Sequence, residues 1–173
     1  MKGPLYIFLW LTLFSCRSNE TDNYSHIDTS QSANQSDTVV KRHFPVAIDF
    51  DKYRIDISQS KKITINLSSN PTARQFRSAI DSSIDKQGTN FAGHYNLVRW
   101  GCGTSCINGA ITDMKTGKVY DLPPATLDYK FRNDSRLLVV NPPDDSGYFE
   151  DCGYCEPELW IWNERIKKFE KQK

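Results

Sequence analysis

The cysteines of this chain have the spacing that most directly suggests chemistry. Cys102 pairs in sequence with Cys106 and Cys152 with Cys155, while Cys16 stands apart near the N-terminus. Each pair brackets turn-forming residues, and the ends of a tight turn lie about 5.5 Å apart, within disulfide reach. We therefore predict two local disulfides. A crossed pairing would close longer loops and stabilise more, so spacing alone leaves the connectivity open.

The same cysteines allow two alternative chemistries. The run from Cys152 to Cys155 resembles the C-x-x-C redox motif of thioredoxin-like proteins, in which a helix N-terminus lowers the pKa of the thiol. Here Glu156-Pro157 and a strand-like run follow, so no helix dipole is expected. The spacings C-x3-C and C-x2-C also approach a zinc-ribbon ligand set. Because exported cysteines are usually oxidised, we expect disulfides, with no metal and no cofactor.

His94 is the candidate catalytic residue of the chain. It is the histidine of the expected folded region, since His26 and His43 lie in or beside a polar N-terminal stretch. A histidine can act as a general base, but one that is hydrogen bonded to hold the fold is the alternative. No Gly-x-Ser-x-Gly elbow and no free thiol is expected beside it, which favours a binding module over a hydrolase that uses His94. The candidate binding residues are Asn90, His94, Tyr95, Trp100, Thr104 and Ser105.

These candidates lie in the most distinctive segment of the chain. It reads Asn90-Phe91-Ala92-Gly93-His94-Tyr95 and, further on, Trp100-Gly101-Cys102-Gly103-Thr104-Ser105-Cys106. The segment resembles the signature of a family of uncharacterised bacterial exported proteins and lipoproteins, over residues 74–122. The resemblance implies a location outside the cytoplasm and no particular activity.

The N-terminus resembles the lipobox signal of bacterial lipoproteins. The apolar run from Leu5 to Phe14 would rise about 15 Å as a helix, half the bilayer core, so it suits a signal peptide. Leu13 stands three residues before Cys16, and the small Ser15 directly precedes that cysteine. The resemblance implies that residues 1–15 are removed and that Cys16 is lipidated. The alternative is an ordinary secretory signal.

The composition predicts a tethered domain. Residues 16–43 are expected to be the lipidated cysteine and a flexible tether, because their polar composition offers too little apolar surface to offset ordering. Residues 44–173 are expected to form one β-rich domain. A net charge of +1, with acids and bases interspersed, argues against nucleic acid. The expected partners are the membrane, through the anchor, and an envelope protein or small ligand. Arg17 stands where inner-membrane lipoproteins often carry Asp, which favours the outer membrane.

Hydrophobic periodicity predicts an α+β fold, mainly an antiparallel β meander with one covering helix and disulfide-pinned turns. The helix begins with Asn70 as N-cap and Pro71 at its first position, and it ends at Gly88. Trp160 and Trp162 share a strand face, where they either pack in the core or, if exposed, stack on a sugar or peptide. Strands are predicted over 46–50, 55–57, 63–67, 91–100, 107–114, 118–122, 129–131, 137–140, 159–162 and 166–169.

Overall fold

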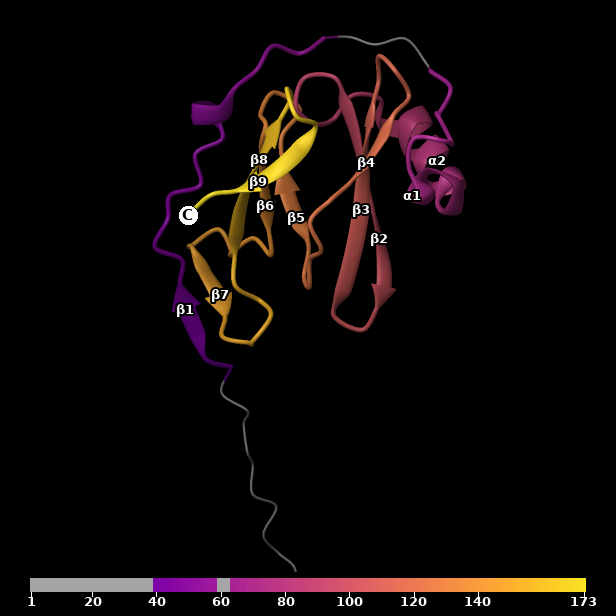
Figure 1. The fold of residues 1–173 in the computed structure, drawn as a ribbon. Coiled ribbons are helices and arrows are strands. Elements are labelled where there is room, and N and C mark those ends of the chain that lie inside the picture. The colour runs from indigo at the N-terminus through magenta and orange to yellow at the C-terminus, as the bar shows by residue number, and fades with distance from the viewer. Residues whose placement is uncertain (1–38, 59–62) are drawn as a thin grey trace, which may run out of the picture. The chain divides into compact units, whose positions relative to one another are not determined.

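Strands dominate residues 39–58 and 63–173, the parts of the chain that the computed structural model describes (Figure 1). The predicted signal peptide, Cys16 and most of the predicted tether lie outside the described residues. Among the described residues, helices are too short or too polar to cross a membrane.

The strands of this region are antiparallel, which confirms the predicted α+β class, and they form three sheets. A three-stranded sheet has the order β2-β3-β4, and a four-stranded sheet the order β5-β6-β8-β9. The remaining strands, β1 and β7, pair with each other. The strands are β1 (Lys41–His43), β2 (Tyr95–Gly103), β3 (Cys106–Asp113), β4 (Val119–Asp121), β5 (Tyr129–Phe131), β6 (Leu137–Val140), β7 (Tyr148–Glu150), β8 (Glu158–Asn163) and β9 (Lys168–Lys171).

The predicted helix is present as two consecutive segments, α1 (Pro71–Gln75) and α2 (Arg77–Gln87). The side chain of Asn70 accepts a hydrogen bond from the backbone N–H of Thr72 at 2.8 Å, which confirms it as the N-cap. Gly88 ends α2 with a φ of 58°, a conformation that favours glycine. Between the segments the backbone leaves helical geometry at Phe76, whose ring stacks on Trp100 at 4.1 Å.

Two apolar cores fix the order of the layers. The two larger sheets pack face to face, and the helices cover the other side of the three-stranded sheet (Figure 1). Side chains alternate across a strand, so Ile111 of β3 points into the core between the sheets while Ala110 points toward the helices. The largest buried side chains between the sheets are Phe91, Tyr95, Leu97, Leu138 and Trp162. Those beneath the helices are Ile65, Ile80, Ile84, Met114 and Val119.

The strands predicted over 46–50 and 55–57 are wrong. This segment is an arm that contains a short 3-10 helix, η1 (Asp51–Tyr53). Ile48, Phe50 and Tyr53 pack against buried residues of the four-stranded sheet. Its backbone bonds go to loops, such as the bond from Ile55 N–H to the carbonyl of Asp134 at 2.9 Å. Apolar and polar residues alternate wherever a chain buries one side and exposes the other. An arm that lies across a sheet therefore gives the same alternation as a strand within a sheet.

Residues 63–67 do not form the predicted strand either. Ile65 is buried beneath the helices, but the segment joins the rest of the fold mainly through a bond from Asn66 N–H to the carbonyl of Gly117, at 2.9 Å. Gly117 has a φ of 74°, and a Cβ there would meet the carbonyl of Thr64. Residues 63–67 are therefore held by the close approach of their backbone to the turn at Gly117, and not by strand pairing.

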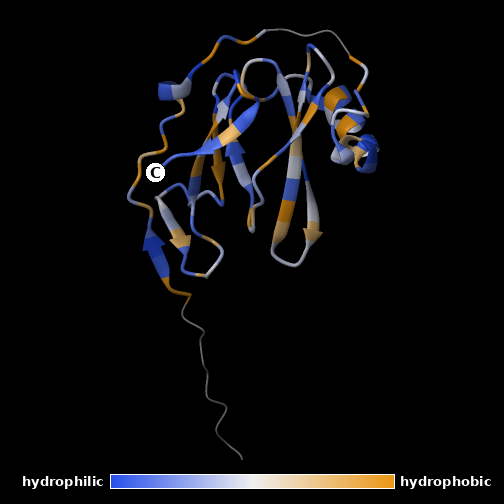
Figure 2. Cartoon of the chain, in the orientation of Figure 1, coloured by the Kyte–Doolittle hydropathy of each residue, from blue (hydrophilic) through white to orange (hydrophobic). Residues whose placement is uncertain are grey.

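The last residues of the range predicted for the tether, residues 16–43, form a strand, so this part of the tether prediction is wrong. β1 pairs with β7 from Lys41 opposite Glu150 to His43 opposite Tyr148. All of β1 is exposed and hydrophilic (Figure 2), so no apolar alternation marks it in the sequence. An ion pair of 2.9 Å between Arg42 and Asp151 adds to the backbone pairing.

Both predicted disulfides are local. Cys102 and Cys106 close the β2–β3 hairpin with a Cα separation of 5.1 Å. Cys152 and Cys155 close the turn after β7 with a Cα separation of 5.2 Å. Each disulfide therefore closes a single turn and does not link the sheets, which are held together by the apolar cores.

Replacing Cys102 and Cys106 together by serine is expected to lower the free energy of unfolding by about 2 kcal/mol, because the bond restricts only a short loop of the unfolded chain. Urea denaturation of the oxidised protein measures this change. The double replacement of Cys152 and Cys155 serves as the matched comparison, with a similar loss expected. A loss of about 4 kcal/mol or more at either pair would contradict local pairing.

Candidate functional site

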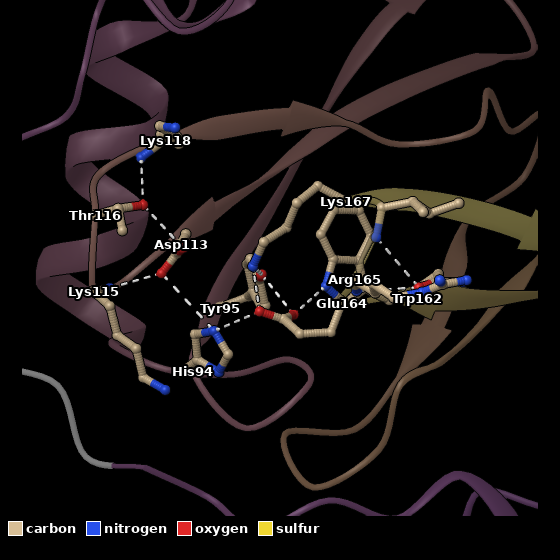
Figure 3. Close-up of polar contacts among 12 residues, drawn as sticks. His94, Tyr95, Asp113, Lys115, Thr116, Lys118, Trp162, Glu164, Arg165 and Lys167 are labelled. Carbon is tan, nitrogen blue, oxygen red and sulfur yellow. Dashed lines mark hydrogen bonds and ion pairs between the residues drawn. The ribbon is translucent and has the colours of Figure 1, made fainter.

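A polar cluster lies where the start of β2, the end of β3 and the β8–β9 loop meet (Figure 3). It draws together residues that are up to 73 positions apart, as between His94 and Lys167. Its members are His94, Tyr95, Asp113, Trp162, Glu164 and Lys167.

A tight loop positions His94. Phe91 and Tyr95 exchange backbone hydrogen bonds of 3.0 and 2.9 Å, and the chain between them turns through left-handed conformations at Ala92 (φ 42°) and Gly93 (φ 78°). A Cβ on Gly93 would lie 2.5 Å from the carbonyl oxygen of Asp56. The strand predicted from residue 91 therefore begins only at Tyr95, and His94 lies in a loop and not on a strand face.

The carboxylate of Glu164 is the hub of the cluster. One of its oxygens accepts hydrogen bonds from the hydroxyl of Tyr95 at 2.7 Å and from the indole N–H of Trp162 at 2.8 Å. The other oxygen is bonded to the ammonium group of Lys167, which also donates to the Tyr95 hydroxyl at 2.8 Å. These bonds join β2 of one sheet to β8 of the other.

The β8–β9 loop brings Glu164 and Lys167 to the same side. Lys167 has a φ of 55°, and its N–H donates to the carbonyl of Asn163 at 2.8 Å. The side chain of Asn163 accepts from the N–H of Arg165 at 3.1 Å. This closed loop, with a polar side chain at its first residue and a left-handed residue at its last, is set by local turn chemistry.

His94 faces two carboxylates but binds neither closely. Its Nε2 atom lies 3.5 Å from Glu164 and 3.9 Å from Asp113, beyond the usual hydrogen-bond range. Asp113 instead accepts from the N–H of Lys115 at 2.8 Å and from the hydroxyl of Thr116 at 2.9 Å. Asp113 therefore closes the β3–β4 turn, and His94 packs beside it with only 7% of its surface exposed.

Burial and neighbouring charges set the protonation of the cluster. Burial lowers the pKa of His94, and the charge of Lys115 lowers it further, against the opposing effect of Glu164 and Asp113. Burial and the hydrogen bond to Glu164 raise the pKa of Tyr95 well above its usual value. Burial tends to raise the pKa of Glu164, but the bonds from Lys167, Tyr95 and Trp162 outweigh it and lower the pKa. A neutral tyrosine thus donates to a charged carboxylate.

This arrangement suits a structural network better than a catalytic one. A general base must reach a substrate proton, whereas Nε2 of the nearly buried His94 is turned toward carboxylates of the protein. Both oxygens of Glu164 are already bonded to side chains of the fold. In the part of the chain that the structure describes, no group of three or more His, Cys, Asp and Glu is arranged to hold a metal ion.

The other predicted binding residues are not brought to one place. Asn90 acts as an additional strand partner, since its side chain accepts from the N–H of Leu97 at 2.6 Å and donates to the carbonyl of Leu97 at 3.0 Å. Thr104 and Ser105 are exposed at the tip of the β2–β3 hairpin. Trp100 packs on Phe76 beside the helices.

Two adjoining clefts run along β4, and we call them together the β4 groove. One has a volume of about 430 Å³, the other about 350 Å³, and Asp121 and Leu122 line both. The first is also lined by Asn70, Tyr120, Pro123, Trp160, Trp162, Lys167 and Phe169. The second is also lined by Thr72, Gln75, Phe76, Trp100 and Asn108.

The cluster supports the wall of the β4 groove. Trp162 and Lys167 line the first cleft with part of their surface and bond to Glu164 with their polar atoms. The sequence singled out Trp100, Trp160 and Trp162 but not Tyr120 or Asp121, which look like ordinary residues of a short edge strand. The partly exposed network therefore bonds to two residues that line one side of the groove, a connection that local sequence does not reveal.

Comparisons with protein-family models, with curated proteins and with solved structures found no match to this chain.

Replacing Tyr95 by phenylalanine is expected to lower the free energy of unfolding by about 1.5–3 kcal/mol, because the hydroxyl is bonded to a charged carboxylate. Urea denaturation at neutral pH measures the loss. The control is Tyr154→Phe, since Tyr154 is 81% exposed, and its effect should stay within about 0.5 kcal/mol. Equal effects of the two replacements would contradict the proposed role of Glu164 as a hub.

The stability of the protein should fall with acidification in a way that depends on His94. The pKa of His94 in the folded chain lies below the usual 6.5, so the unfolded chain takes up the proton first as the pH falls. The contribution of this residue is therefore complete above pH 6.5 and is lost progressively below it. Denaturation at about pH 7.5 and about pH 5.5 should show a smaller pH effect in His94→Gln than in the wild type. An unchanged difference would contradict the lowered pKa.

Proposed function

We propose that this protein is a bacterial envelope lipoprotein whose domain is a non-catalytic binding module, with its ligand in the β4 groove. The observation that carries the proposal is the groove itself, lined by half-buried aromatic and polar side chains and backed by the hydrogen bonds of Glu164 with Tyr95, Trp162 and Lys167. Ligand sites are typically concave, partly aromatic and held rigidly by the fold.

The N-terminal sequence supports the anchoring half of the proposal. The run from Leu13 to Cys16 has the lipobox pattern, and the polar residues after it suit a tether. Two local disulfides suit a protein that folds in an oxidising compartment, as exported proteins do. Arg17 after the proposed lipidated cysteine favours the outer membrane.

A hydrolase that uses His94 is the second candidate, favoured by the two carboxylates beside its imidazole. The burial of His94 and the engagement of Glu164 weigh against it. A redox or zinc protein is supported less, because both cysteine pairs are closed and no described helix begins at Cys152.

The test uses the full chain expressed in bacteria and a Cys16→Ser variant. We expect the wild type in the membrane fraction with a mass increased by its acyl chains, and the variant in the soluble fraction. The purified mature variant should then co-sediment with isolated envelope fragments. Adding Asp121→Ala should weaken this co-sedimentation at least about tenfold, whereas adding His94→Gln should not.

The exposed Tyr154 supplies a matched control, because it lies outside the lining of the β4 groove. Tyr154→Ala should leave co-sedimentation unchanged. A wild-type chain without the added acyl mass, or a Cys16→Ser chain that carries it, would overturn the anchor. A dominant effect of His94→Gln on turnover of envelope material would favour the hydrolase.

A further inference from the structure

We infer that the ligand of the β4 groove is an extended, uncharged glycan chain. This inference rests on the proposed function and names its ligand class. It follows from the aromatic surfaces, the hydrogen-bonding groups, the charge and the strand edge of the groove.

Aromatic rings line both halves of the groove. In the first cleft the rings of Tyr120, Trp160 and Phe169 are half-buried, so each presents part of its surface while the rest packs on the core. In the second cleft Trp100 is held parallel to Phe76, with an angle of 15° between the rings. Pyranose rings present flat C–H faces that pack on aromatic faces. Two aromatic platforms on either side of Asp121 suit consecutive sugar units.

The polar groups between these platforms suit vicinal hydroxyls. Asn70 donates from its amide to one carboxylate oxygen of Asp121 at 2.9 Å, while its own oxygen accepts from Thr72 N–H. Asp121 is exposed and lines both clefts, and the bond from Asn70 restrains its carboxylate there. Gln75 and Asn108 add amide groups in the second cleft. Adjacent donors and acceptors match a hydroxyl, which both donates and accepts.

The charge of the groove excludes a strongly charged ligand. The charged residues that line the two clefts are Asp121, Lys167 and Lys168. Lys167 is already bonded to Glu164, so its charge is compensated within the protein. One remaining acid and one remaining base give a nearly neutral lining, whereas an anionic polymer would need several cations.

The strand edge disfavours an extended peptide. A peptide that adds to a sheet needs a row of free backbone groups along an edge strand. β4 has only the residues Val119–Asp121, and the N–H of Val119 is occupied by the hydroxyl of Ser69 at 3.1 Å. So short an edge, with one of its N–H groups occupied, offers little backbone to an added strand. The side chains of the groove therefore supply the affinity in this inference, as they do for sugars.

The experiment titrates the mature Cys16→Ser chain with linear tetrasaccharides and follows tryptophan fluorescence and heat. The probes are β-1,4-linked glucose, β-1,4-linked N-acetylglucosamine and α-1,4-linked glucose, with a random decapeptide mixture for comparison. We expect saturable binding of at least one tetrasaccharide and none of the peptides. Trp160→Ala and Asp121→Ala should each weaken it at least about tenfold, and Tyr154→Ala should not.

Asp121 is exposed, so Asp121→Ala keeps the test valid if Trp160→Ala fails to fold. Binding of the peptides in place of the tetrasaccharides would overturn the glycan assignment. Tetrasaccharide binding that neither Trp160→Ala nor Asp121→Ala weakens would overturn it too. Co-sedimentation with envelope fragments that depends on Asp121, without binding of any tetrasaccharide, would overturn the glycan and leave the binding module standing. If neither the tetrasaccharides nor the envelope fragments bind, both the glycan assignment and the binding-module proposal are overturned.

Discussion

The bonds on the carboxylate of Glu164 are the interaction on which the rest of the structure depends. Tyr95 begins β2, an edge strand of the three-stranded sheet, Trp162 lies in β8 of the four-stranded sheet, and both donate to the same oxygen of Glu164. The side chain of Glu164 is 40% exposed, and its bonds to both sheets form only where the sheets meet in a geometry that supplies these donors. The apolar core between the sheets stabilises their contact, but the hydrophobic effect is non-directional and does not fix how the sheets are oriented. The hydrogen bonds of the Glu164 carboxylate are directional, so they orient the two sheets. They also hold the β8–β9 loop, with Lys167, at the side of the β4 groove.

Features with local chemistry were predictable from the sequence. The capping of the helix by Asn70, its end at Gly88 and the closure of both cysteine pairs follow from groups a few residues apart. The strands near 107–114 and 137–140 follow from apolar runs that the core needs. The N-terminal arm was mistaken for strands because one-sided burial gives the same alternation in either case. β1 was missed because it buries no side chain.

The site could be predicted only in part, for a different reason. His94 and Tyr95 stood out as unusual residue types, but Glu164 and Lys167 look like ordinary residues of a polar turn. They matter because the fold brings that turn against the start of β2, and no local pattern encodes this contact. The left-handed conformation of Ala92 is likewise invisible in the sequence, and it moves His94 from the predicted strand face into a loop. The distinctive segment around Asn90 consequently serves mainly to begin β2.

The pairing of β1 with β7 has a mechanical consequence for a domain held by its N-terminal side. Tension along the chain would reach the fold first at Lys41–His43, which is fully exposed and joined to one neighbouring strand. This pairing lies outside the two apolar cores, so it would separate under tension before they do. The arm beyond it, which packs on the four-stranded sheet through Ile48 and Phe50, would separate next. The chain would thus lengthen under tension at β1 and the arm before the sheets that border the β4 groove come apart.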